Sequence, residues 1–144
     1  MQEKIKKIFI DGKAGTTGLR IYDRLADRED TRLITLPEEQ RKDISSRKRA
    51  LNEADVVFLC LPDAAAIEAA ELIENPDTVV IDTSTAHRTQ EGWAYGFPEL
   101  SKEHEEKIIT SKRIAVPGCH AGGFIALVYP LIESGILDSS AVVI

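Results

Sequence analysis

The sequence has few cysteines and no long hydrophobic run. Cys60 and Cys119 are its only two thiols, too few for a disulfide scaffold and more typical of a reducing compartment. The apolar stretches are short, the longest lying near 124–132, so no membrane span or membrane partner is expected. Met1 leads directly into charged residues without the apolar core of a secretory signal, and we expect a cytoplasmic protein.

Basic residues are also in deficit. The chain has 18 Lys and Arg against 24 Asp and Glu, which gives a net charge of -6. Nucleic-acid-binding proteins usually present a basic face, so no nucleic-acid partner is expected. No group of residues predicts a metal site. Local basic clusters can still bind a small anion.

Strand and helix patterns alternate along the 144 residues. The predicted strands are 5–11, 33–36, 54–61, 79–82 and 113–116, and the predicted helices are 17–26, 64–74, 101–110 and 118–135. The segment 37–49 is expected to be an exposed loop with a short helix, and a last strand is expected at 141–144. Such alternation predicts an α/β fold with a Rossmann-like, doubly wound, mostly parallel sheet.

Three glycines separate the first predicted strand from the first helix. Gly12, Gly15 and Gly18 form a GxxGxxG pattern, in which glycine permits a tight turn and close approach of the backbone to a pyrophosphate. The following helix directs its N-terminus at the anion. The pattern therefore favours dinucleotide binding, with a plain strand-to-helix turn as the alternative.

The end of the second predicted strand bears on the choice of coenzyme. NAD-binding folds usually carry an Asp or Glu there for the ribose 2'-hydroxyl, whereas the segment 33–36 has none. Arg41 and Lys42 follow and could bind the 2'-phosphate of NADP, although charged loops are often merely solvated.

A second turn carries a thiol. Cys119 follows Pro117 and Gly118 at the predicted start of an apolar helix, where the positive helix end favours a thiolate. A thiolate can attack an activated acyl carbon and expel phosphate, leaving a thioester that accepts hydride. Neighbouring helical positions diverge by about 100°, so His120 and Cys119 need not meet, and His120 is interpreted as a pocket wall. Cys60, inside a strand, is interpreted as an inert small hydrophobe.

The segment 82–88 follows a predicted strand at the sheet edge where ligands collect. Ser84 could donate to a ligand and Arg88 could hold an anionic one. The alternative is that Asp82 and Ser84 cap local backbone and that Arg88 pairs at the surface. His104, on the next helix, is expected to be exposed to solvent.

Taken together, several motifs resemble the shorter, type 2 branch of N-acetyl-gamma-glutamyl-phosphate reductase. These are IDGKAGTTGLRI at 10–21, RKD at 41–43, LCLPDAA at 59–65, DTSTAHR at 82–88, WAYGFPEL at 93–100 and PGCHAGGFIALVYPL at 117–131. The resemblance implies NADPH-dependent reduction of N-acetyl-L-glutamyl 5-phosphate to the 5-semialdehyde, with release of phosphate, in arginine biosynthesis. It also implies a homo-oligomer at full length.

The resemblance assigns roles to particular residues. It implies that Cys119 is the nucleophile. Arg88, from its place beyond a strand end, and His120 and Gly122, from their places beside the thiol, are expected to contact the substrate. The cofactor-binding residues that it implies, together with those from the strand ends, are Gly12, Ala14, Gly15, Thr16, Thr17, Gly18, Arg41, Leu61, Pro62, Asp63 and Ser84. Many relatives have Tyr-Pro-Thr-Gly after the nucleophile, whereas this chain has His-Ala-Gly-Gly at 120–123.

The resemblance also suggests a division of the chain. Residues 1–116 are expected to form an NADP-binding domain, and 117–144 the truncated start of an α+β catalytic and dimerisation domain. The family's acid/base histidine lies in the part that follows, so this chain is expected to bind NADP(H) but to turn over little substrate. The alternatives are an enzyme like aspartate-semialdehyde dehydrogenase and a non-catalytic NADP-binding module.

Overall fold

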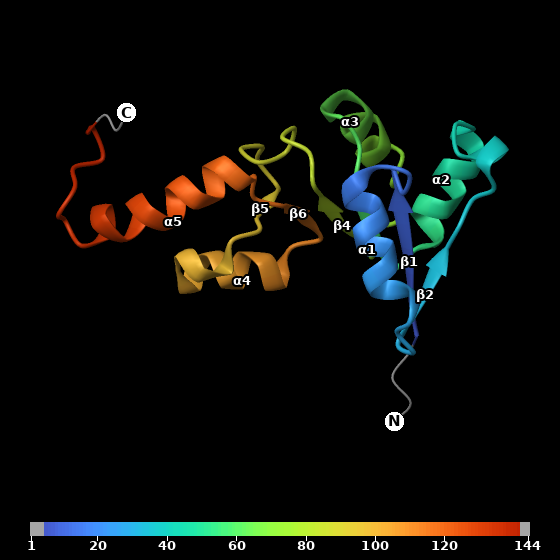
Figure 1. Ribbon diagram of the computed structural model, residues 1–144, viewed down its shortest axis with the longest axis horizontal. Helices are drawn as coiled ribbons and strands as arrows, with labels where there is room; N and C mark the ends of the chain where they lie inside the picture. The colour runs from blue at the N-terminus through green and yellow to red at the C-terminus, as the bar shows by residue number, and fades with distance from the viewer. Residues whose placement is uncertain (1–4, 142–144) are drawn as a thin grey trace.

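The computed structural model describes residues 5–141 and contains a six-stranded parallel sheet in the order β2-β1-β3-β4-β6-β5 (Figure 1). The strands are β1 (Lys6–Asp11), β2 (Thr31–Ile34), β3 (Val56–Leu59), β4 (Val79–Asp82), β5 (Ala94–Tyr95) and β6 (Arg113–Ala115). The helices are α1 (Thr16–Ala26), α2 (Ile44–Glu53), α3 (Asp63–Glu71), α4 (Lys102–Thr110) and α5 (Cys119–Glu133), with short 3-10 turns η1 (Glu38–Gln40) and η2 (Pro98–Leu100). The predicted parallel α/β sheet is confirmed.

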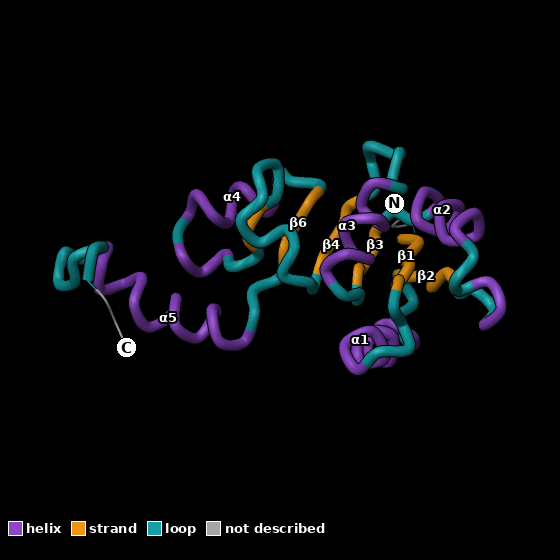
Figure 2. The backbone as a smooth tube through the Cα atoms, turned by 90° about the horizontal axis from the view of Figure 1, so that it is seen from above, coloured by secondary structure: helices purple, strands orange, loops and turns teal. Residues whose placement is uncertain are grey.

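The chain winds in two directions from β1. Strand β2 pairs with one edge of β1 and β3 pairs with the other, with all neighbours parallel. Helix α1 covers one face of this end of the sheet and α2 the other (Figure 2). The chain thus reverses its direction of winding between β1 and β3, and in such folds ligands bind beyond the strand ends at that point.

Two predicted elements differ from the structure. Strand β2 lies two residues earlier than the predicted 33–36, and α2 occupies much of the segment 37–49 that was predicted to be mainly loop. Helix α2 has few large apolar residues, but Asp43 caps it by accepting a hydrogen bond from the backbone N–H of Ser46 at 2.7 Å. Its buried side consists of Ser46, Ala50 and Leu51. Because most of these buried residues are small, the sequence shows only a weak helical periodicity of large apolar residues.

The hydrophobic core lies between the central strands and α2. Leu51, Val57, Leu59 and Val80 are completely buried there. Strands β3 and β4 pair in register and place Val57, Leu59 and Val80 in this core. The core is therefore at the end of the sheet that carries the glycine turn.

Helix α5 is different, because it has no buried residue and extends away from the sheet (Figure 1). The ring of Tyr129 meets that of His104 on α4 edge-on, with centroids 6.1 Å apart. His104 is half-buried and bonded to Ser101, so the expectation of a solvent-exposed His104 is wrong. The strand expected at 141–144 falls almost wholly outside the described residues. No helix within 5–141 combines the length and hydropathy of a membrane span.

Candidate functional site

The glycine turn joins β1 to α1 at the carboxyl edge of the sheet. Gly12 has φ +85°, and a Cβ there would lie 2.8 Å from the carbonyl carbon of Cys60. A Cβ on Gly18 would lie 2.5 Å from the carbonyl oxygen of Gly12. These two glycines are therefore required by the packing of the turn itself.

The packing of the turn does not require a glycine at Gly15. It is the N-cap of α1, and a Cβ there would meet only the Gly12 carbonyl oxygen, at an ordinary 3.4 Å. The turn thus leaves open space at the end of a helix whose first N–H groups lack side-chain caps. This is the arrangement that a pyrophosphate requires.

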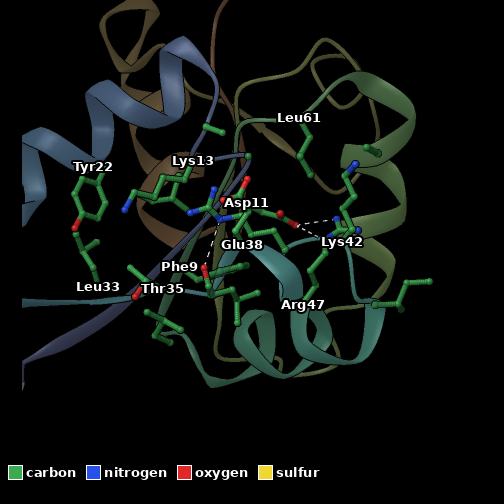
Figure 3. Close-up of a pocket in the computed structure, with 18 of the residues that line it drawn as sticks. Phe9, Asp11, Lys13, Tyr22, Leu33, Thr35, Glu38, Lys42, Arg47 and Leu61 are labelled. Carbon is green, nitrogen blue, oxygen red and sulfur yellow. Dashed lines mark hydrogen bonds and ion pairs between the residues drawn. The ribbon is translucent and has the colours of Figure 1, made fainter.

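A cavity of about 660 Å³ lies beside this turn at the ends of β1, β2 and β3 (Figure 3). Four of the predicted cofactor residues line it, namely Gly12, Ala14, Arg41 and Leu61. Gly15 and Gly18 are outside its lining, while Thr16 and Thr17 line a separate, smaller pocket on α1. Volume and mixed lining suit a nucleotide.

An ion pair at the base of this cavity was not predicted from the sequence. Arg47 of α2 donates to one oxygen of Asp11, from Nε at 3.2 Å and from Nη2 at 2.9 Å. Both side chains are about nine-tenths buried, and Glu68 lies 3.8 Å from Nη1. Burial makes this pair costly to break on one side. The only sequence signal was an acidic residue directly before Gly12.

Pro62 and Asp63 begin α3. Pro62 is the N-cap residue, and the carboxylate of Asp63 accepts hydrogen bonds from the backbone N–H of Thr85, at 2.9 Å, and from its hydroxyl. These hydrogen bonds lower the pKa of Asp63 below its usual value. Asp63 therefore connects α3 to the loop that follows β4.

That loop contains a buried polar network. Asp82 is fully buried and accepts from the Ser84 hydroxyl at 2.6 Å, and His87 Nδ1 lies 2.6 Å from the same carboxylate oxygen. The His87 ring stacks on Trp93 with centroids 3.9 Å apart. The Ser84 hydroxyl also accepts a hydrogen bond from the backbone N–H of Ala86. These bonds stabilise the loop, which agrees with the alternative that Ser84 caps local backbone.

Arg88 links this loop to the cysteine turn. Its Nε donates to the carbonyl oxygen of Val116 at 3.0 Å. A Cβ on Gly118 would lie 2.5 Å from Nη1 of Arg88, so glycine makes room for the guanidinium. Arg88 thus brings a positive charge next to the residue that precedes Cys119.

Cys119 is exposed at the first position of α5. The structure differs from the sequence interpretation of its neighbour, because His120 Nδ1 lies 3.4 Å from Cys119 Sγ, within hydrogen-bonding distance for sulfur. The two side chains leave the helix in different directions, but the longer histidine side chain can still fold back toward the sulfur. Gly122 N–H donates to the Gly118 carbonyl oxygen at 2.7 Å and closes the first turn of the helix.

Cys60 has a different environment. It is half-buried just beyond β3, and burial raises the pKa of its thiol. A raised pKa disfavours the reactive thiolate, in agreement with the interpretation of an inert residue.

The glycine turn and Cys119 both follow strands of one parallel sheet, so both lie at its carboxyl edge. The sequence profile described as "Semialdehyde dehydrogenase, NAD binding domain" matches residues 7–108. The chain belongs to this family. The resemblance to N-acetyl-gamma-glutamyl-phosphate reductase that the sequence motifs suggested is also confirmed, because curated relatives of that name are more than half identical to this chain.

Three relatives illustrate this similarity. The chain is 54% identical over 132 residues to N-acetyl-gamma-glutamyl-phosphate reductase 2 of Pseudomonas putida, covering 92% of this chain and 42% of that protein. It is 55% identical to the corresponding reductase of Mesorhizobium japonicum, covering 92% and 43%, and 52% identical to that of Trichormus variabilis, covering 93% and 42%. The chain thus spans less than half the length of these relatives.

Solved structures support the fold. Aspartate semialdehyde dehydrogenase of Francisella tularensis matches 90% of this chain and 41% of its own with a TM-score of 0.66 at 12% identity. The enzyme of Candida albicans with NADP matches 91% and 48% with a TM-score of 0.64 at 21% identity. At these identities the likeness concerns the fold alone.

Proposed function

We propose that this chain is the coenzyme-binding and nucleophile-bearing part of an NADPH-dependent N-acetyl-L-glutamyl 5-phosphate reductase. The observation that carries the proposal is an exposed Cys119 at the same sheet edge as a dinucleotide-type glycine turn and cavity. The substrate class follows from the relatives that are more than half identical to this chain.

The residues present fit NADP(H). The open position at Gly15 and the uncapped start of α1 suit the pyrophosphate, and the cavity beside Gly12 and Leu61 suits the adenosine. We assign Ala14 to the same site, together with Thr16 and Thr17 at the start of α1. Arg41 lines the cavity from its solvent-exposed side. Pro62 and Asp63 shape it by starting α3. When bound, the nicotinamide supplies hydride chemistry.

The chain's own residues perform the covalent step. Cys119 Sγ attacks the acyl carbon, a carbon–sulfur bond forms, the bond from carbon to the phosphate oxygen breaks, and phosphate leaves. His120 Nδ1, 3.4 Å from Sγ, is placed to accept the thiol proton. Arg88 lies against Gly118, and its positive charge suits the anionic substrate. Gly122 leaves room on the first turn of α5.

The proposal includes a division of labour along the chain. Residues 1–116 serve coenzyme binding, and 117–144 begin the catalytic and dimerisation part. Because the chain spans 42% of its relatives' length, we propose that it binds NADPH but turns over little substrate by itself. We further propose a cytoplasmic enzyme that is a homo-oligomer at full length.

The test is acylation of the chain by N-acetylglutamyl 5-phosphate in a single turnover. We expect the mass of one N-acetylglutamyl group on Cys119 and release of one equivalent of phosphate. Cys119→Ser should abolish both signals, and Cys60→Ser, the matched control, should retain them. Aspartyl phosphate should react more slowly. Equal reaction with both acyl phosphates would favour an enzyme like aspartate-semialdehyde dehydrogenase, and no acylation at all would favour a non-catalytic binding module.

A further inference from the structure

We propose that Lys13, with Thr35 and Tyr22, forms the subsite for the 2'-phosphate of the coenzyme. The inference rests on the proposed function, since it specifies how the chain selects NADP(H) over NAD(H). It differs from the sequence interpretation, which gave this role to Arg41 and Lys42. Lys13 belongs to the glycine turn itself.

The ammonium group of Lys13 is held over an aromatic ring. Its Nζ lies 3.2 Å from the centre of the Tyr22 ring on α1, and the lysine is half-buried. Among residues 5–141 the side chain has no carboxylate partner in an ion pair. A cation–π contact orients the charge without neutralising it. Lys13 is thus a positioned cation that can still bind an anion.

Thr35 supplies the second part of the subsite. It is the first residue after β2, the position at which dinucleotide-binding folds present the group that contacts the ribose 2'-oxygen. NAD-binding members use a carboxylate there, which would repel a phosphate. Here a hydroxyl takes its place. Lys13, Tyr22 and Thr35 line the same side of the cavity, as the close-up shows (Figure 3).

The other cations of the cavity are less suited to this role. Arg47 is bound to Asp11 and faces Glu68. Arg41 Nε donates to the carbonyl oxygen of Leu36 at 3.4 Å, and Arg41 is exposed to solvent.

Lys42 is also exposed, and Figure 3 shows it on the opposite side of the cavity from Lys13 and Tyr22. Arg41 and Lys42 follow the acidic η1 turn, whose Glu38 also lines the cavity. The other acidic residues that line the cavity, Asp11 and Glu68, face Arg47, so within residues 5–141 the acidic side chain without a cationic partner there lies on the segment of Arg41 and Lys42.

Calorimetric titration of the 144-residue chain with NADPH and with NADH tests the proposal. For Lys13→Met we expect the Kd for NADPH to rise by about ten- to a hundredfold, since a charge-assisted bond is lost. The Kd for NADH should change little. Lys13→Arg should retain the preference, and Tyr22→Leu should lose part of it. Arg41→Met and Lys42→Met, which remove exposed charges, should change the Kd for NADPH by less than about fivefold.

Two results would overturn the inference. One is a larger loss of NADPH binding in Arg41→Met or Lys42→Met than in Lys13→Met. The other is an unchanged preference for NADPH in a Lys13→Met protein whose thermal unfolding matches that of the parent. A parent chain that binds neither dinucleotide would instead contradict the proposed function, so the two failures are distinguishable.

Discussion

The glycine turn and the cysteine turn lie at the same edge of one sheet, but they are supported very differently. The glycine turn packs against the Cys60 carbonyl and stands next to the core formed by β1, β3, β4 and α2. The cysteine turn is joined to the rest by Arg88, and the helix that follows has no buried residue. The end with the glycine turn is held by hydrophobic packing, whereas the end with the cysteine turn is held by a few polar contacts.

This difference matters for function. A pyrophosphate site needs backbone atoms fixed before the ligand arrives, and the packing around Gly12 provides such preorganisation. A nucleophile needs exposure to substrate, and Cys119, the proposed nucleophile, is exposed. Its helix is correspondingly little packed among the described residues, where the contact of Tyr129 with His104 is one of its few neighbours. Substitutions at the two turns should therefore have unequal effects on stability.

The largest effect is expected for Gly12→Ala, with Gly92→Ala as its matched control. Both glycines have nearly the same positive φ, +85° and +82°, but a Cβ would clash with backbone only at Gly12, since nothing lies within 4 Å at Gly92. We expect the free energy of unfolding to fall by about 4 kcal/mol for Gly12→Ala, from strain plus overpacking, and by about 1 kcal/mol for Gly92→Ala. Urea denaturation measures both. Equal losses would mean that packing against Cys60 does not support the turn.

A smaller contrast is expected between two helical leucines. Leu51 of α2 is 0% exposed, whereas Leu127 of α5 is 75% exposed. Leu51→Ala should lower the free energy of unfolding by about 3 kcal/mol because it leaves a cavity. Leu127→Ala should change it by less than about 0.5 kcal/mol. Thermal unfolding followed by circular dichroism gives both values. A large loss for Leu127→Ala would show that α5 is packed in solution and would remove the contrast between the two ends.

The same contrast explains what the sequence could predict. The order of strands and helices and the place of the glycine turn follow from local patterns, because apolar runs and glycine spacing are properties of neighbouring residues. Helix α2 was largely missed because its buried side is mostly small. The ion pair of Arg47 with Asp11 joins residues 36 positions apart, and the contact of Lys13 with Tyr22 depends on side-chain direction. Neither contact leaves a periodic pattern in the sequence, so each can be recognised only in the folded structure.

The smallest effect concerns Asp63, which connects the two ends by bonding α3 to the loop that carries Arg88. Its pKa is lowered in the folded protein by hydrogen bonds from Thr85, so the ionised form stabilises the fold at pH values above the ordinary aspartate range. This contribution should be lost as the pH falls through the lowered pKa. Asp63→Asn should therefore be less stable than the parent at neutral pH, and the difference should shrink in acid. Urea midpoints measured from neutral to acidic pH test this, with Asp23→Asn on exposed α1 as the control for loss of one charge. A difference between Asp63→Asn and the parent that stays constant with pH would show that this carboxylate does not join the two ends through its charge.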